Sequence, residues 1–80
     1  MHHQHHQGKY IAVQRFKQGY KQWQFAKLID VSPSRMSVIE QTAELEEPTL
    51  QKIATALKLP VHEIKGEQKI EGGGGTDDYP

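Results

Sequence analysis

Apolar residues recur through the first part of the chain with the spacing of two short amphipathic helices. The first helix is predicted over KYIAVQRFKQG and ends at Gly19, because glycine readily takes the left-handed conformation that follows a helix. The second helix is predicted over KQWQFAKLI, with an inner face made of Phe25, Ala26 and Ile29. The apolar residues of the first helix are spread unevenly around its axis: Tyr10, Ile11, Val13 and Phe16.

A third helix is predicted directly after the stretch DVSP, with almost no connecting chain. Asp30 stands in the turn, and aspartate is one of the few residues other than glycine that tolerates a left-handed conformation. Ser32 is a suitable N-cap, and Pro33 follows at the first helical position, where its missing N–H costs nothing. The spacing turns Met36 and Ile39 toward the interior.

A fourth helix is predicted over LQKIATALKL, with Thr49 as its N-cap and Pro60 at its end. The stretch VHEI then forms one last short turn. No clean period-two strand occurs, so we predict an all-α fold, a compact bundle of four or five short helices over residues 8–66. One apolar stripe of the fourth helix faces the core: Leu50, Ile53, Ala54 and Leu57.

Two polar segments flank the predicted domain. Residues 1–7, MHHQHHQ, have no apolar periodicity and are predicted to be a disordered His-rich leader, either natural or left from a purification tag. Residues 67–80 contain GGGG and several acidic residues and are predicted to be a flexible tail. Imidazoles bind zinc or nickel, but nothing in the sequence would orient this cluster, so no metal site is expected from His2, His3, His5 and His6.

The distribution of charge along the chain says more about function than the total charge does. The formal net charge is zero, yet residues 1–41 carry a net charge of plus four and residues 42–80 a net charge of minus four. Such a chain can present a basic face to a polyanion although its total charge is nil. The absence of cysteine excludes disulfides and thiolate metal sites. No apolar stretch is long enough to cross a membrane, so a cytoplasmic protein is expected.

The close succession of the second and third helices points to a particular geometry. Two helices joined by a tight turn cross at a steep angle, roughly 90–120°. DNA-reading domains use this arrangement to brace one helix on the backbone while the next enters the major groove. An αα corner in an unrelated helical domain is the alternative interpretation of the same spacing.

The stretch GKYIAVQRFKQGYKQWQFAKLIDVSPSRMSVIEQ, followed by EPTLQKIATALKLPVHEI, resembles the Xre/Cro-like helix-turn-helix family of phage-repressor type. The resemblance covers about residues 8–65 and implies a lambda-repressor-like fold. It also implies a buried ion pair between Arg15 and Glu40, which stand where the family often has one. Two unrelated surface charges are the alternative.

The resemblance further implies which residues meet DNA. Gln22 stands where the family's second helix begins with a glutamine that binds a phosphate, at the positive end of the helix dipole. Arg35 and Gln41 would also lie near phosphates, with Lys17 and Lys21 as electrostatic candidates, although a solvated charge is the alternative for each lysine. The outward face of the third helix would present Ser32, Ser34, Ser37 and Val38 to the bases.

Several residues depart from the family's pattern. Lys21 replaces the Ser or Thr that normally caps the second helix, Asp30 replaces the usual turn glycine, and AELEE makes the following loop acidic. The reading face offers no bidentate Arg–guanine or Gln–adenine pair, which are the strong discriminators. Trp23 and Leu28 are expected on the exposed face of the second helix, and tryptophan is enriched in interaction hot spots.

These residues predict a sequence-specific double-stranded DNA-binding transcriptional regulator, a repressor or an antitoxin-like protein. Its recognition helix would be about Ser32–Gln41, and it would act as a symmetric dimer. The dimer surface would come from Leu59, Val61 and Ile64, with plain core packing as the alternative for each. A protein-interaction module that contacts partners through Trp23, Leu28 and Val38 is the alternative function. No catalytic motif occurs, so neither an enzyme nor a cofactor is expected.

Overall fold

The computed structural model describes residues 5–66, and within them the helices are the only regular secondary structure. The predicted all-α bundle is confirmed, and the predicted tail lies outside the described residues. No helix in this part of the chain is long and apolar enough to cross a membrane. The five helices are α1 (Gln7–Lys17), α2 (Gln22–Leu28), α3 (Pro33–Glu40), α4 (Glu47–Leu57) and α5 (Val61–Lys65).

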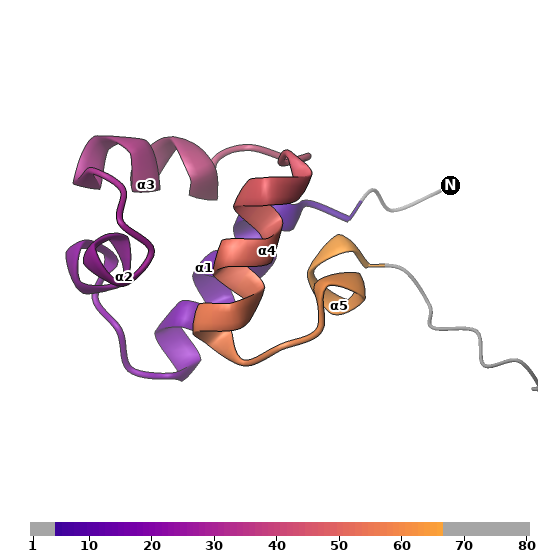
Figure 1. The fold of residues 1–80 in the computed structure, drawn as a ribbon, viewed down its shortest axis with the longest axis horizontal. Helices are drawn as coiled ribbons and strands as arrows, with labels where there is room; N and C mark the ends of the chain where they lie inside the picture. The colour runs from indigo at the N-terminus through magenta and orange to yellow at the C-terminus, as the bar shows by residue number, and fades with distance from the viewer. Residues whose placement is uncertain (1–4, 67–80) are drawn as a thin grey trace, which may run out of the picture.

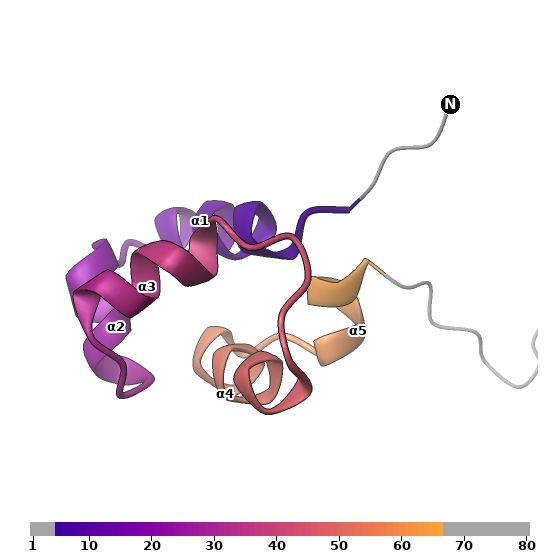
Figure 2. The same ribbon diagram turned by 90° about the horizontal axis from the view of Figure 1, so that it is seen from above.

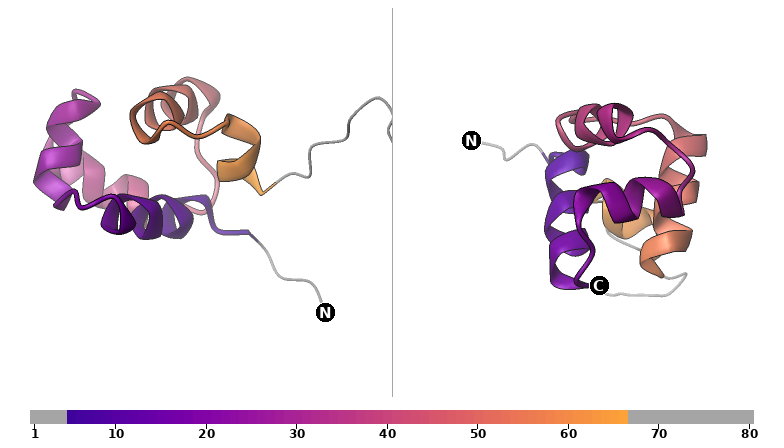
Figure 3. Two further views of the ribbon diagram at one scale, coloured as in Figure 1. Left: turned by 90° about the horizontal axis from the view of Figure 1, so that it is seen from below. Right: turned by 90° about the vertical axis from the view of Figure 1, so that its left-hand side faces the viewer.

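The helices α2 and α3 occupy one end of the molecule, and α5 occupies the other (Figure 1). In this view α2 is seen along its axis while α3 runs across the page, so the two helices are steeply inclined to each other. Seen from above, α1 and α4 lie on opposite sides of the molecule (Figure 2). α3 packs against both α1 and α2, and it extends over the top of α2 in the right-hand view of Figure 3.

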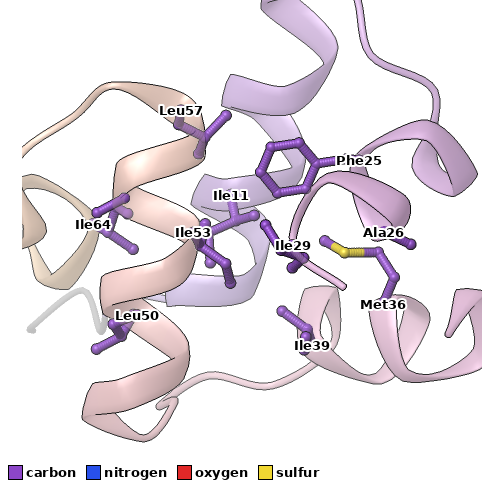
Figure 4. Close-up of a cluster of buried hydrophobic side chains, with 11 residues drawn as sticks. Ile11, Phe25, Ala26, Ile29, Met36, Ile39, Leu50, Ile53, Leu57 and Ile64 are labelled. Atoms are coloured by element: carbon purple, nitrogen blue, oxygen red, sulfur yellow. The ribbon is translucent and has the colours of Figure 1, made fainter. Parts of the chain in front are cut away.

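A single hydrophobic core joins all five helices (Figure 4). The predicted inner faces of the second, third and fourth helices are all buried, because their apolar residues follow the helical period toward one another. Each large aliphatic or aromatic side chain buried in this way contributes about 1.5–3 kcal/mol of transfer free energy. The buried apolar residues are Ile11, Phe25, Ala26, Ile29, Met36, Ile39, Leu50, Ile53, Ala54, Leu57 and Ile64.

Ile64 belongs to the core and not to a dimer surface, so the core packing considered for this residue is confirmed. Its side chain is completely buried, and it fills the core between α5 and the rest of the bundle. Leu59 and Val61 are partly buried and pack against the same core. A five-residue helix can hold its place only through such burial, since it is too short to be stable by itself.

The turn between α2 and α3 has the predicted local chemistry. Asp30 has a φ of 62°, in the left-handed region, and the N–H of Val31 then donates to the carbonyl of Ala26 at 2.9 Å. Ser32 caps α3, because its Oγ accepts a hydrogen bond from the N–H of Arg35 at 3.1 Å. These bonds use the backbone groups that a helix end leaves without partners, and they allow the chain to reverse within a few residues.

The first helix begins earlier than predicted, so the leader prediction for residues 1–7 is wrong at its end. α1 starts at Gln7, and the Nδ1 of His6 caps its first turn. The backbone N–H of Gln7 donates to the carbonyl of Ala43 at 2.9 Å, and its Oε1 accepts from the N–H of Leu45 at 2.6 Å. These partners lie in the loop after α3, which explains why Gln7 is only 7 % exposed. The first four residues lie outside the described part.

Gly8 allows the start of α1 to approach the end of α3 very closely. Its N–H donates to the carbonyl of Thr42 at 2.9 Å. A Cβ on Gly8 would lie 2.5 Å from the carbonyl oxygen of Ile39 and 2.6 Å from that of Glu40. The positive end of the α1 dipole therefore lies against the negative end of α3, and only glycine fits between the two backbones.

The residue before α1 also contacts the far end of the chain. The Nε2 of His5 lies 2.7 Å from the carbonyl oxygen of Ile64, and its ring centroid lies 5.3 Å from that of Tyr10. Partial burial raises the pKa of Tyr10, and the neighbouring carboxylate of Glu63 raises it further. The two ends of the described chain thus meet beside α5.

The prediction that Thr49 caps α4 is wrong. The helix begins at Glu47, with Glu46 as the N-cap and Pro48 in its first turn. The first helical hydrogen bond runs from the N–H of Leu50 to the carbonyl of Glu46 at 3.0 Å. Proline fits the first turn because its φ is already helical, and the Glu47 carboxylate is favourable at the positive end of the dipole.

The end of α4 also precedes the predicted stop at Pro60. The helix ends at Leu57, and Lys58 takes a left-handed conformation with a φ of 60°. The Nε2 of Gln18 donates to the carbonyl of Leu57 at 2.9 Å, which fixes the end of α1 to the end of α4. Pro60 instead serves as the N-cap of α5.

Candidate nucleic-acid interface

α3 has one buried side and one exposed side. Met36 and Ile39 are completely buried. Successive residues of an α-helix are turned by about 100° around its axis, so residues about one turn apart lie on the same side. Ser34, Val38 and Gln41 are spaced in this way and lie on the side opposite to Met36 and Ile39. The outward ridge of α3, defined here as Ser34, Val38 and Gln41, is exposed along its whole length, with Arg35 and Ser37 on its flanks.

Some of the residues predicted to contact DNA make hydrogen bonds at the ends of α3 itself. Ser32 is exposed, but its oxygen already accepts the capping hydrogen bond described above, which leaves its hydroxyl hydrogen to donate. At the other end the Nε2 of Gln41 lies 3.5 Å from the Oγ of Ser37. Gln41 and Ser37 therefore lie side by side in the last turn.

Arg15 and Glu40 form an ion pair between α1 and the end of α3. The Nε of Arg15 lies 2.6 Å from Oε2 of Glu40, and its Nη2 lies 3.4 Å from Oε1. The two side chains are only 15 % and 9 % exposed. The two-nitrogen contact fixes the direction of α3 relative to α1, because a planar guanidinium meets a carboxylate in few orientations.

Gln22, the first residue of α2, joins this ion pair. Its Nε2 donates to Oε1 of Glu40 at 2.9 Å, while the Nη1 of Arg15 donates to the carbonyl of Tyr20 at 2.7 Å. The cluster of Arg15, Gln22 and Glu40 thus connects three helices. The amide of Gln22 keeps a second N–H and its oxygen for another partner.

The two candidate lysines lie in different places. Lys21 lines a shallow hollow together with Phe16 and Gln22, at the start of α2. Lys17 is two residues beyond Arg15, so it projects from nearly the opposite side of α1. Lys17 accordingly lies away from the direction in which α1 faces α3.

Lys21 is the N-cap residue of α2 and its side chain has no oxygen to offer the first turn. The reciprocal hydrogen bond of a capped helix is present, because Oε1 of Gln24 accepts from the backbone N–H of Lys21 at 2.8 Å. The position of Gln24, three residues after the cap, is the one signal in the sequence for this bond.

Replacing Lys21 by serine is expected to stabilise the domain. A serine Oγ can accept the hydrogen bond that lysine cannot, which is worth about 0.5–1 kcal/mol and raises the melting temperature by about 4 °C. Thermal unfolding followed by circular dichroism measures the effect, with Lys27→Ser inside α2 as the control. An unchanged or lower melting temperature for Lys21→Ser would show that the cap is already satisfied.

The loop after α3 is acidic and exposed. Glu44 and Glu46 are exposed, and Glu47 forms a 2.9 Å ion pair with Lys65 of α5. The bond from Lys65, together with a weaker one from Gln51, lowers the pKa of the Glu47 carboxyl. This loop adds negative charge close to the end of the outward ridge.

Several large apolar side chains are exposed on the described surface. Phe16 is the most exposed at 78 %, and Val13, one turn before it on α1, is half exposed. The expected exposure of Trp23 and Leu28 is confirmed. Val38 is 51 % exposed and is the only one of these residues on the outward ridge of α3.

The histidines do not form a metal centre in the described part of the chain. Residues 5–66 contain no group of three or more His, Cys, Asp or Glu side chains placed to hold an ion. His5 contacts the carbonyl of Ile64, and His6 caps α1. Both imidazoles therefore have structural partners.

The comparisons with known proteins agree with this geometry. No protein-family model matches the chain, and no curated protein matches it. Among solved structures it is similar to SinR, the master regulator for biofilm formation, solved in complex with DNA. The two share 27 % sequence identity and a TM-score of 0.66, over 72 % of this chain and 95 % of that chain. The predicted resemblance is confirmed, and this chain has the Xre-like helix-turn-helix fold.

Proposed function

We propose that this protein is a transcriptional regulator that binds double-stranded DNA with α3 in the major groove. One observation carries the proposal: α3 has an exposed, mainly polar outward ridge, while its inward side and its end are fixed by the core and by the cluster of Arg15, Gln22 and Glu40. A helix held in this way can enter a groove without rearranging. The likeness to SinR, a protein solved in complex with DNA, supports the same conclusion.

The proposed contacts divide into positioning and reading. Gln22 keeps a free amide hydrogen at the start of α2, next to Lys21, and both are proposed to contact phosphates. Arg35 on the flank of the ridge and Gln41 at its end are proposed to contact the DNA backbone. The residues proposed to face bases are Ser32, Ser34, Ser37 and Val38. Lys17 contributes only long-range attraction, because it projects away from α3.

The charge distribution predicts modest affinity for DNA with only a weak dependence on salt. The basic residues of the first half attract the duplex, whereas Glu44 and Glu46 in the loop after α3 repel it. The observed affinity of a DNA-binding protein falls with salt according to the number of phosphates that it neutralises. Few such contacts are proposed here, so the slope is expected to be small.

Binding to random-sequence duplex DNA at about 50 and 200 mM salt tests this proposal by fluorescence anisotropy. Arg35→Gln is expected to weaken binding and to reduce the slope of log affinity against log salt by about one, because one phosphate contact is lost. Gln22→Ala is expected to weaken binding without changing the slope, since glutamine carries no charge. Lys52→Gln on the exposed side of α4 is the matched control and should leave both quantities unchanged.

Absence of binding at low salt would contradict the regulator proposal for this chain. Equal losses for Arg35→Gln and Lys52→Gln would contradict the assignment of α3, because they would indicate unspecific attraction by net charge. Circular dichroism of each variant confirms that the fold is retained. This check matters most for Gln22→Ala, which also removes a hydrogen bond from Glu40.

The finer features of the regulator are proposals as well. We propose a cytoplasmic protein that acts as a symmetric homodimer, with half-sites about one helical turn apart. A repressor and an antitoxin-like protein that also binds a protein partner are both compatible with this architecture. Leu59 and Val61 remain candidates for the dimer contact, since they are only partly buried.

Protein–protein interaction without DNA binding is the second candidate function. The exposed Phe16, Trp23 and Leu28 favour it, because aromatic side chains are enriched in interface hot spots. The acidic loop also favours it. The anisotropy measurement separates the two candidates, since an interaction module would not bind the duplex even at low salt.

A further inference from the structure

The outward ridge of α3 contains one aliphatic side chain between two polar ones. Ser34 precedes Val38 by one turn, and Gln41 follows it by nearly one turn. Val38 is half exposed, so about half of an apolar side chain faces the solvent at the centre of the reading face. The core does not require this exposed half, because Met36 and Ile39 supply the buried contacts of α3.

Val38 is held rigidly at this place. Its carbonyl accepts hydrogen bonds from the Oγ1 of Thr42 at 2.6 Å and from the N–H of Gln41 at 3.0 Å. A valine side chain in a helix has essentially one rotamer. The two methyl groups of Val38 therefore point in a fixed direction from a fixed backbone.

The neighbours of Val38 allow a close approach to a flat surface. Ser34 and Ser37 are the residues one turn before it and directly before it, and both are short. A long side chain at either position would hold the helix away from the floor of a groove. The exposed surface of α3 is therefore lowest around Ser34 and Ser37. Val38 can then make direct van der Waals contact with the floor of the groove.

We infer that Val38 reads thymine through its C5-methyl group in the major groove. This inference rests on the proposed function. Of the four base edges in the major groove, only thymine presents an apolar group, whereas the other groups there are hydrogen-bond donors and acceptors that an aliphatic side chain leaves without partners. Val38 is thus the main determinant of sequence preference on a ridge that has no arginine at its centre.

The test uses a duplex selected from a random library with the full chain, followed by replacement of each thymine by uracil. Uracil lacks only the methyl group and keeps the pairing edge of thymine. At one thymine of each half-site, the replacement is expected to weaken binding by about fourfold, the value of one buried methylene-sized group. Elsewhere in the site it should have little effect.

A thermodynamic cycle separates direct contact from DNA shape. Val38→Ala should bind the thymine and uracil duplexes equally, because alanine does not reach the methyl group. Val38→Thr keeps one of the two methyl groups and should retain part of the preference. Lys52→Gln on α4, outside the proposed interface, is the control and should keep the full fourfold difference. Alanine at an exposed helical position leaves the fold intact.

Two results would overturn the inference while leaving DNA binding established. The first is a selected duplex in which no uracil replacement weakens binding. The second is a thymine preference that persists in Val38→Ala, which would assign it to the deformability of the duplex. Failure to bind any duplex would overturn both the inference and the proposed function.

Discussion

Glu40→Ala is expected to lower the free energy of unfolding by about 3 kcal/mol, most of the stability of a domain of this size. The substitution leaves the guanidinium of Arg15 mostly buried without its carboxylate partner, and it also removes the acceptor of Gln22. The cost of an unpaired buried charge exceeds the value of the pair itself. Urea unfolding followed by circular dichroism measures the loss.

The second ion pair of the described structure supplies a matched control. Glu47 and Lys65 also form a close ion pair, but both side chains are more exposed. Glu47→Ala is therefore expected to cost much less than Glu40→Ala, since water screens exposed pairs. Similar losses for Glu40→Ala and Glu47→Ala would contradict a structural role for the cluster of Arg15, Gln22 and Glu40.

Gly8→Ala is expected to destabilise the domain by about 1–3 kcal/mol, as overpacking does in a dense interior. Alanine normally stabilises an exposed helix relative to glycine by about 0.5–1 kcal/mol, so the expected sign is the reverse of the usual one. The reason is the close approach of two backbones, because the new Cβ would lie within 2.6 Å of the carbonyl oxygens of Ile39 and Glu40. Backbone atoms cannot move aside as a flexible side chain can.

The effect of Gly8→Ala can be measured by the same urea unfolding, with Lys9→Ala as its neighbour control. Lys9 is exposed on α1, so its replacement should change the stability by less than about 0.5 kcal/mol. A Gly8→Ala variant more stable than the parent would show that α1 and α3 do not meet as described. Hydrogen exchange gives a second readout, because the amide of Gly8 should lose protection when α1 moves away from Thr42.

The elements that could be predicted from the sequence are those determined by local chemistry. The apolar periods of the second, third and fourth helices identify their buried faces, because burial of a helix follows its own repeat. The turn at Asp30 and the cap at Ser32 are likewise properties of a few adjacent residues. These features need no knowledge of the distant parts of the chain.

The features that could not be predicted depend on contacts between distant segments. Gln7 looks like part of a polar leader until the loop containing Ala43 and Leu45 is placed beside it. Ile64 could be assigned either to a dimer surface or to the core until α5 is folded onto the rest of the bundle. The early start of α4 at Glu47 was missed because Thr49 is also a good capping residue by type.

Only part of the candidate site could be predicted from the sequence. The resemblance placed Arg15 and Glu40 together, and the structure has them within hydrogen-bond distance. It gave no indication that Gln22 also binds Glu40, or that Lys17 projects away from α3. The first depends on the relative orientation of helices, which a single sequence does not contain. The second follows from the spacing of Lys17 and Arg15 within one helix, a signal that the sequence does contain. The DNA contacts themselves remain predictions.

The division of α3 into a buried side and an exposed ridge has an evolutionary consequence. Met36, Ile39 and Glu40 hold the helix in place, whereas Ser34 and Val38 take no part in the core. Mutations on the ridge therefore escape the stability threshold that removes most other mutations from a population. A duplicated copy of this gene could drift toward a new target while its scaffold stayed constant, and two regulators with different targets would then descend from one fold.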